Sequence, residues 1–154
     1  MGVFDESICD CCVCPMQCVL EQLEGQLVGL RTTAGNFDAI LDNVNNFIVN
    51  YTDGVSSNRN LAISQIIAFE FDPELNPNGI RLKPLKNSVG ECKCIEDPIT
   101  NLLNSLKGKE EVEIIFLNGS ISGIITNVGN GVVLVGDNVI ISTCNIIIVT
   151  PIPT

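Results

Sequence analysis

The stretch Asn118-Gly119-Ser120-Ile121-Ser122-Gly123-Ile124-Ile125-Thr126-Asn127-Val128 lies in the second half of this 154-residue chain. Asn-Gly at the start of a β-rich run is a strong hairpin signal, because both residues tolerate the backbone angles of a tight turn. Gly123 interrupts the run and allows a sharp bend, since glycine lacks a Cβ atom. The stretch therefore predicts a hairpin whose second strand, residues 120–128, is long and bent.

Similar runs, rich in β-branched residues and bounded by turn residues, predict nine further strands. Asn130-Gly131 and Asp53-Gly54 mark two of the turns. The other strands are expected at 26–32, 37–44, 47–51, 61–64 and 66–71 in the first half, and at 112–117, 132–135, 139–142 and 145–149 in the second.

A short amphipathic helix is expected before each set of strands. Apolar residues recur at i, i+3, i+4 and i+7 from Met16 and again from Ile99. Asp97-Pro98 provides an N-cap and a first helical residue, and Gly25 and Gly108 follow the two helix ends.

The two halves align as an internal duplication, beginning with the pairs Cys12-Val-Cys14 and Cys92-Lys-Cys94. Five positions match at an offset of 84, among them Gly35 with Gly119. Ile63-Ser64 matches Ile141-Ser142 at an offset of 78, which predicts a loop in the first half that is six residues longer.

The sequence of the bent second strand resembles the corresponding pattern of the Sm-like family, in which a turn glycine precedes a bent strand and an Asn-Val or Asp-Val step. The residues that carry this likeness are Gly119 to Val128 and Gly35 to Val44. The resemblance implies a mainly β chain of two tandem Sm-like barrels, each a short helix plus about five antiparallel strands. A generic small β-barrel is the alternative. The expected domains are a Cys-rich arm (1–14), a first barrel (15–73), a linker (74–91) and a second barrel (92–154).

Sm-like proteins form rings and often bind RNA, and this sequence departs from the second property. Gln65-Ile66 and Thr143-Cys144 stand where the family tends to have Arg-Gly or Lys-Gly. The chain has 8 Lys and Arg against 18 Asp and Glu, for a net charge of −10. Nucleic-acid binding needs clustered cations and aromatic stacking surfaces, so RNA or other nucleic-acid binding is not expected. Ring-like or strand-edge assembly is what the resemblance implies.

Five of the eight cysteines lie between Cys9 and Cys18. A Cys-rich N-terminus before tandem barrels also resembles coat, exosporium and appendage proteins of bacterial endospores. That resemblance implies synthesis in the mother-cell cytosol without a signal peptide and a final location on the spore surface. It also implies that the partners are further copies of the chain and other spore-surface proteins.

Three uses of the cysteines remain open. Disulfides between subunits are favoured, because adjacent or one-apart cysteines pair poorly with each other. The candidates are Cys9, Cys11, Cys12, Cys14, Cys18, Cys92, Cys94 and Cys144. Bonds within the chain are the simpler alternative. A zinc-binding adaptor would use Cys11, Cys14, Cys92 and Cys94 as ligands.

Ile146-Ile147-Ile148-Val149 is apolar on both strand faces, which favours a last strand buried between barrel and helix. An edge that pairs with a neighbouring barrel is the alternative. The chain has no His, so Ser-His and Cys-His catalytic pairs are excluded. Together these features predict a self-assembling structural protein with no enzyme activity, cofactor or membrane partner.

Overall fold

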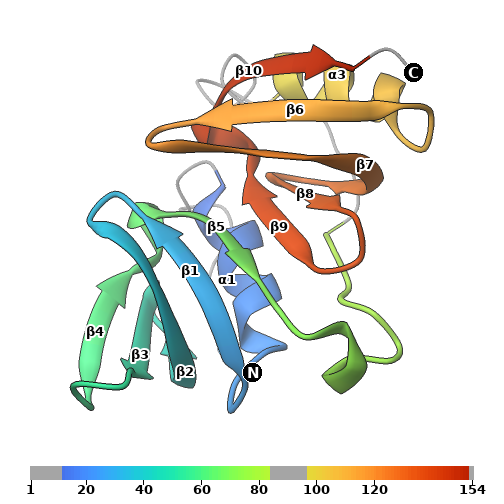
Figure 1. Cartoon of the computed structure of the whole chain (residues 1–154). Helices are drawn as coiled ribbons and strands as arrows, with labels where there is room; N and C mark the ends of the chain where they lie inside the picture. The colour runs from blue at the N-terminus through green and yellow to red at the C-terminus, as the bar shows by residue number, and fades with distance from the viewer. Residues whose placement is uncertain (1–11, 84–96, 153–154) are drawn as a thin grey trace.

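The computed structural model describes residues 12–83 and 97–152, which form two helices and ten strands in the order α1, β1–β5, α3, β6–β10 (Figure 1). In the first half α1 (Val13–Glu21) precedes β1 (Leu27–Thr32), β2 (Gly35–Asn45), β3 (Ile48–Thr52), β4 (Arg59–Ala62) and β5 (Ile66–Glu70). In the second half α3 (Asp97–Leu106) precedes β6 (Glu111–Phe116), β7 (Gly119–Gly129), β8 (Val132–Val135), β9 (Val139–Ser142) and β10 (Ile146–Pro151). The mainly β class is confirmed, and each predicted strand overlaps an observed one. The strand predicted at 61–64 is shifted, because β4 spans Arg59–Ala62 and Ile63 and Ser64 lie in a 3₁₀ turn.

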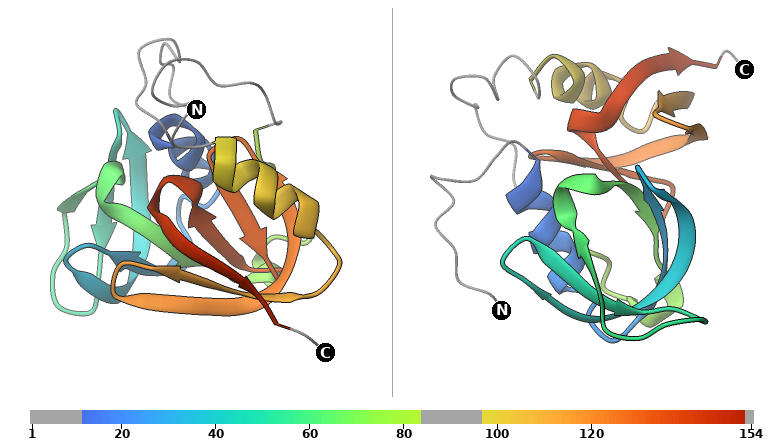
Figure 2. Two further views of the ribbon diagram at one scale, coloured as in Figure 1. Left: turned by 90° about the horizontal axis from the view of Figure 1, so that it is seen from above. Right: turned by 90° about the vertical axis from the view of Figure 1, so that its left-hand side faces the viewer.

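The described strands form one antiparallel sheet in the order β10-β6-β7-β8-β9-β5-β1-β2-β3-β4. The sheet is open, with β10 and β4 at its two ends, so the expected pair of separate barrels is not what the strands form. The first-half strands nevertheless curve strongly around a shared interior (Figure 2, right). The pairing of β5 with β9 joins the two halves into this continuous sheet.

β2 and β7 produce the curvature because each pairs with two neighbours over different parts of its length. β7 pairs with β6 up to Ile124 and with β8 from Ile125 onward, followed by a register shift before Asn127. A Cβ atom on Gly123 would lie 2.8 Å from Val135 Cγ1, so a glycine at the predicted bend gives β8 room to pack closely. The expected bent second strand is confirmed.

A glycine in the left-handed region follows each helix, Gly25 (φ 85°) after the end of α1 at Glu21 and Gly108 (φ 71°) after the end of α3 at Leu106. Each glycine N–H donates to the long strand of its own half, to the Leu41 carbonyl at 2.6 Å and the Ile125 carbonyl at 2.8 Å. These matching bonds hold equivalent helices against equivalent strands, which supports the duplication inferred from sequence.

The duplication needs one correction. The strands β1 to β3 match β6 to β8 at an offset of 84, since Gly35 and Gly119 both begin a second strand. From the fourth strand onward the offset is 80 and not 78, because Arg59 begins β4 and Val139 begins β9. Strand side chains alternate with a period of two, so an alignment displaced by two residues keeps the same inward-facing pattern.

Two apolar cores lie on either side of the junction, and each half contributes to both. The first core holds α1 and β1–β5 residues together with Val132 and Ile140 of the second half. The second core includes Ile67 and Ala68 of β5. The two halves therefore share their apolar cores and are not independent domains joined by a linker.

Parts of the expected arm and linker also pack against the first half. Cys12 and Cys14, placed in the arm by the sequence, are both buried at the start of α1. Ile80 and Leu82, placed in the linker, pack on the first core. Both Gln22 amide atoms bind the Arg81 backbone, with Oε1 accepting at 2.9 Å and Nε2 donating at 2.8 Å, so this part of the linker is fixed.

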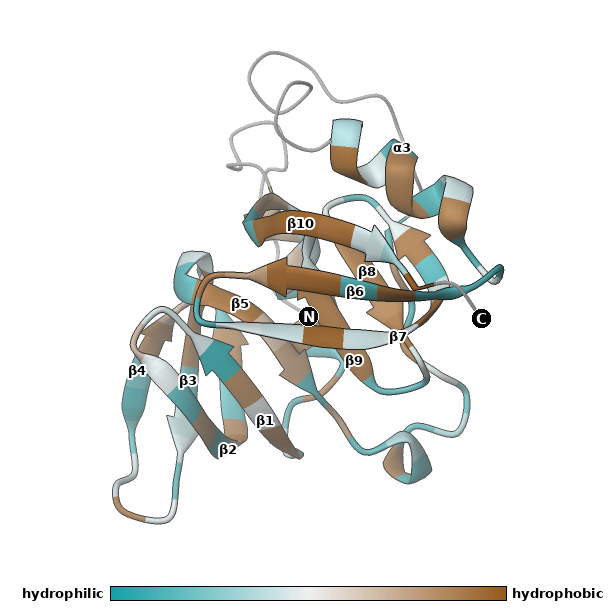
Figure 3. Ribbon diagram, turned by 45° about the horizontal axis from the view of Figure 1, so that its top comes forward, coloured by the Kyte–Doolittle hydropathy of each residue, from teal (hydrophilic) through white to brown (hydrophobic). Residues whose placement is uncertain are grey.

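β10 is not buried in the way that the sequence favoured. Ile147 is 61% exposed and Ile148 is 48% exposed, and the strand lies at the end of the sheet beyond β6. The first part of the strand is brown and lies next to β6 (Figure 3). The edge alternative for this segment fits the structure.

Candidate functional site

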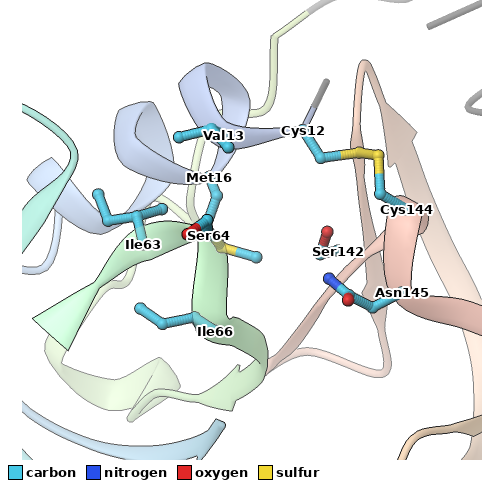
Figure 4. A pocket seen from close by; sticks show the side chains of 9 residues that line it. All are labelled: Cys12, Val13, Met16, Ile63, Ser64, Ile66, Ser142, Cys144 and Asn145. Atoms are coloured by element: carbon cyan, nitrogen blue, oxygen red, sulfur yellow. A yellow bond between two sulfur atoms is a disulfide. The ribbon is translucent and has the colours of Figure 1, made fainter. Parts of the chain in front are cut away.

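A disulfide joins Cys12, just before α1, to Cys144 in the 3₁₀ turn η4 (Thr143–Asn145) (Figure 4). The two Cα atoms are 6.1 Å apart, although the residues are 132 positions apart in sequence. This bond lies within one chain and ties the first helix to the second half. For these two residues the structure therefore replaces the predicted bond between subunits with a bond inside the subunit.

The surroundings of Cys12 bring three segments together. The Thr143 hydroxyl lies 3.5 Å from Cys12 Sγ and must be the donor, because a sulfur in a disulfide has no hydrogen. Thr143 N–H donates to the Gly131 carbonyl at 3.1 Å. Gly131 has φ 75°, and a Cβ on it would lie 2.9 Å from Pro15 Cγ. Glycine is thus required for the β7–β8 turn to approach α1.

A small cavity of about 220 Å³ lies beside the disulfide. Its walls come from α1, from the 3₁₀ turn η2 (Ile63–Gln65) with β5, and from β9 with η4. The lining residues are Cys12, Val13, Met16, Ile63, Ser64, Ile66, Ser142, Cys144 and Asn145 (Figure 4). Among these described lining residues there is no acidic or basic side chain, so they provide no group for acid-base chemistry or for pairing with a charged ligand.

The remaining cysteines divide into three groups. Cys14 is buried and is disulfide-bonded as well. Cys18 lies on α1, is half-buried and is a free thiol. The other four candidates, Cys9, Cys11, Cys92 and Cys94, lie outside the described residues.

The zinc alternative loses one ligand in this state of the protein. Zinc binds cysteine as the thiolate, and the Cys14 sulfur is already in a disulfide. Within residues 12–83 and 97–152, no three Cys, Asp or Glu side chains are grouped so that they could hold a metal ion.

Sequence reasoning missed a buried polar contact that shapes the first half. Gln17 is 1% exposed, and its Oε1 accepts from the Phe47 backbone N–H at 2.6 Å. Its Nε2 donates to Glu21 at 3.1 Å. Phe47 lies in the β2–β3 turn with φ 65°, so Gln17 holds a turn whose backbone glycine would adopt more easily. A glutamine one residue after Met16, on the apolar side of a helix, was the available signal.

The second candidate site consists of the two free edges of the sheet. β10 and β4 are the terminal strands of the described sheet and lie at opposite ends of the molecule (Figure 1). β10 presents Ile147 and Ile148, and β4 presents the exposed residues Arg59 and Asn60. An edge strand leaves backbone N–H and C=O groups unpaired, so it is a template for a further strand.

No protein family model, curated protein or solved structure matches this chain. Neither α1 nor α3, nor any other helix in the described part of the chain, has the length and apolar character needed to cross a membrane.

Proposed function

We propose that this protein is a self-assembling structural subunit whose copies associate through the edges of the sheet. One observation carries the proposal: the two halves of the chain are already joined edge to edge, by β5 and β9, with the Cys12–Cys144 bond beside that junction. The chain therefore contains an example of the association, and the sheet formed by its described residues ends in two edge strands of the same kind, β10 and β4.

The composition supports assembly as the role of the surface. Only 17% of residues are charged while 45% are hydrophobic, and several large apolar residues outside the two cores are exposed. Each copy carries a net charge of −10, so copies repel one another at low ionic strength. Added salt screens that repulsion and is expected to promote assembly.

Covalent stabilisation is the second part of the proposal. We propose that Cys9 and Cys11 of one copy form disulfides with Cys18, Cys92 or Cys94 of another copy. Each bridge forms when two thiols lose two protons and two electrons to an oxidant such as dioxygen. The bridge then prevents dissociation on dilution.

The setting we propose is the surface of a bacterial spore, as a coat, exosporium or appendage component built on an Sm-like arrangement. The basis is the resemblance of the cysteine-rich N-terminus and the tandem repeats to such proteins. In that setting the chain is made in the mother-cell cytosol and its cysteines oxidise after the cell lyses.

Gel electrophoresis of air-oxidised protein in detergent without reductant tests the covalent part. We expect a ladder of multimers that collapses to monomer when reductant is added. Replacing Cys9 and Cys11 by Ser should remove the ladder. Replacing Cys12 and Cys144 by Ala is the matched control and should leave it, because those two sulfurs pair within the chain. Monomer in every lane would refute cross-linking between subunits.

A further inference from the structure

We propose that β10 of one copy pairs with β4 of a second copy, in the register that β5 and β9 use inside the chain. This inference rests on the proposed self-assembly and specifies its interface. The partner is another copy of this chain, attached head to tail.

The first step is that β10 is the structural equivalent of β5. Both are fifth strands that pair with the first strand of their own half, Phe69 opposite Leu30 and Val149 opposite Ile114. Both pairings also contain a register shift near the start of the fifth strand. The two strands therefore present their free sides in the same way.

The second step is that β4 is the structural equivalent of β9. Each is a fourth strand paired with the third strand of its half, Leu61 opposite Val49 and Ile141 opposite Val133. Inside the chain, the fifth strand of the first half pairs with the fourth strand of the second. One fifth strand and one fourth strand remain at the sheet ends, so a second copy can repeat the junction.

The third step transfers the register. Ala68, Phe69 and Glu70 pair with Ile141, Ile140 and Val139. The β10 equivalents of these β5 residues lie 80 positions later, and the β4 equivalents of the β9 residues lie 80 positions earlier. The same register therefore places Ile148, Val149 and Thr150 opposite Leu61, Asn60 and Arg59 of the next copy.

Burial and charge both fit this contact. Ile67 and Ala68 are 1% and 0% exposed at the internal junction, whereas their equivalents Ile147 and Ile148 are 61% and 48% exposed. An equivalent contact would cover both isoleucines. Arg59 would face Thr150, whose other neighbour is Glu113 of β6. Strands lie about 4.8 Å apart, so the arginine could reach the glutamate across one strand.

A contact between two different edges is heterologous, so each added copy leaves one β10 and one β4 edge free. Such contacts build a ring if the rotation closes and a filament if it does not. They also make a precise mixing experiment possible, because each edge can be blocked separately.

Two variants block the edges at exposed or half-exposed positions. Ile148→Lys blocks β10, and the double variant Arg59→Glu with Asn60→Glu blocks β4. Ile40→Lys, at a position 42% exposed on β2, is the matched control away from both edges. Circular dichroism and thermal unfolding establish that each variant is folded, and sedimentation velocity measures its mass.

We expect the wild type and Ile40→Lys to form species larger than a dimer, either a ring of fixed mass or a filament that grows with concentration. Each edge variant alone should lose every species above monomer. An equimolar mixture of the two edge variants should give dimer and nothing larger, because one intact β10 meets one intact β4.

The contrary results separate the two proposals. A wild type that stays monomeric at all concentrations overturns self-assembly itself. A wild type that assembles while both edge variants also assemble leaves self-assembly standing and overturns this interface. Assembly of the β4 variant alone, with loss in Ile148→Lys, would mean that β10 pairs with β10, which also contradicts the head-to-tail contact.

Discussion

β5 and β10 occupy the same place in the two halves of the molecule and have opposite environments. Each follows a 3₁₀ turn and pairs with the first strand of its half. β5 has β9 on its other side and its first four residues are buried, whereas β10 has no second strand beside it in the described sheet. β10 therefore resembles β5 without a neighbouring strand, and its isoleucines are exposed as a result.

The difference shows that burial of an apolar strand depends on what lies beside it more than on its own sequence. Ile67 and Ile147 are both isoleucines at equivalent positions of the two halves, but Ile67 is 1% exposed and Ile147 is 61% exposed. They provide a matched pair for measuring what the junction contributes.

The largest expected effect comes from truncating that pair. Ile67→Ala should lower the free energy of unfolding by about 2–5 kcal/mol, because it removes buried methyl groups and leaves a cavity. Ile147→Ala should change it by no more than about 0.5 kcal/mol in dilute monomer, because its side chain faces water. Urea unfolding of both variants measures the contrast. Equal losses would mean that the two strands are not in different environments.

Removing the disulfide beside the junction should have the next largest effect. The double variant Cys12→Ala, Cys144→Ala loses a link across 132 positions, which we expect to cost about 2–4 kcal/mol. Cys144 corresponds to Ser64 in the first half, so the first half has no cysteine at the equivalent position.

Urea unfolding without reductant measures the effect of the disulfide. Cys18→Ala is the control and should change stability little, because Cys18 is a free, half-buried thiol. If the double variant matched the wild type in stability, the bond would not be holding the halves together.

The smallest expected effect concerns the loop between β3 and β4, which is longer than the turn between β8 and β9. Asp53 Oδ1 accepts from the backbone N–H groups of Val55 at 2.8 Å and Ser56 at 2.7 Å. The bonds from Ser56 and Val55, with the charge of Arg59, hold the pKa of Asp53 below its usual 3.8.

A lowered folded pKa means that the carboxylate stabilises the protein above the unfolded value, and this contribution is lost as the pH falls through the folded value. Asp53→Asn should therefore be less stable than wild type at pH 6, with a smaller difference at pH 3. Ser56→Ala keeps the backbone N–H and should preserve the wild-type pH dependence. Urea midpoints at both pH values provide the test, and a difference that does not change with pH would contradict it.

The strands and turns were predictable because their signals are local. Val132–Val135 and Val139–Ser142 match the predicted strands at both ends. The later part of the repeat was misaligned because Ile63-Ser64 resembles Ile141-Ser142, and a shift of two residues preserves the alternation of a strand.

Local patterns could not identify the neighbour of each strand. Ile146–Val149 is apolar on both faces, which fits a buried central strand and an edge strand that pairs with another subunit equally well. The sequence favoured burial, and the structure has this segment at the end of the sheet. The Gln17 contact with Phe47 was missed for the same reason, because helix periodicity does not specify which turn packs against the helix.

The secondary structure, the duplication and the bend at Gly123 follow from the amino-acid sequence, because each depends on nearby residues or on a pattern repeated along the chain. The pairing of β5 with β9, the bond between Cys12 and Cys144, and the position of β10 and β4 at the ends of the sheet appear only in the folded chain. These contacts join residues separated by tens of positions or more. They depend on how the whole chain closes on itself, for which strand alternation and cysteine spacing contain no signal.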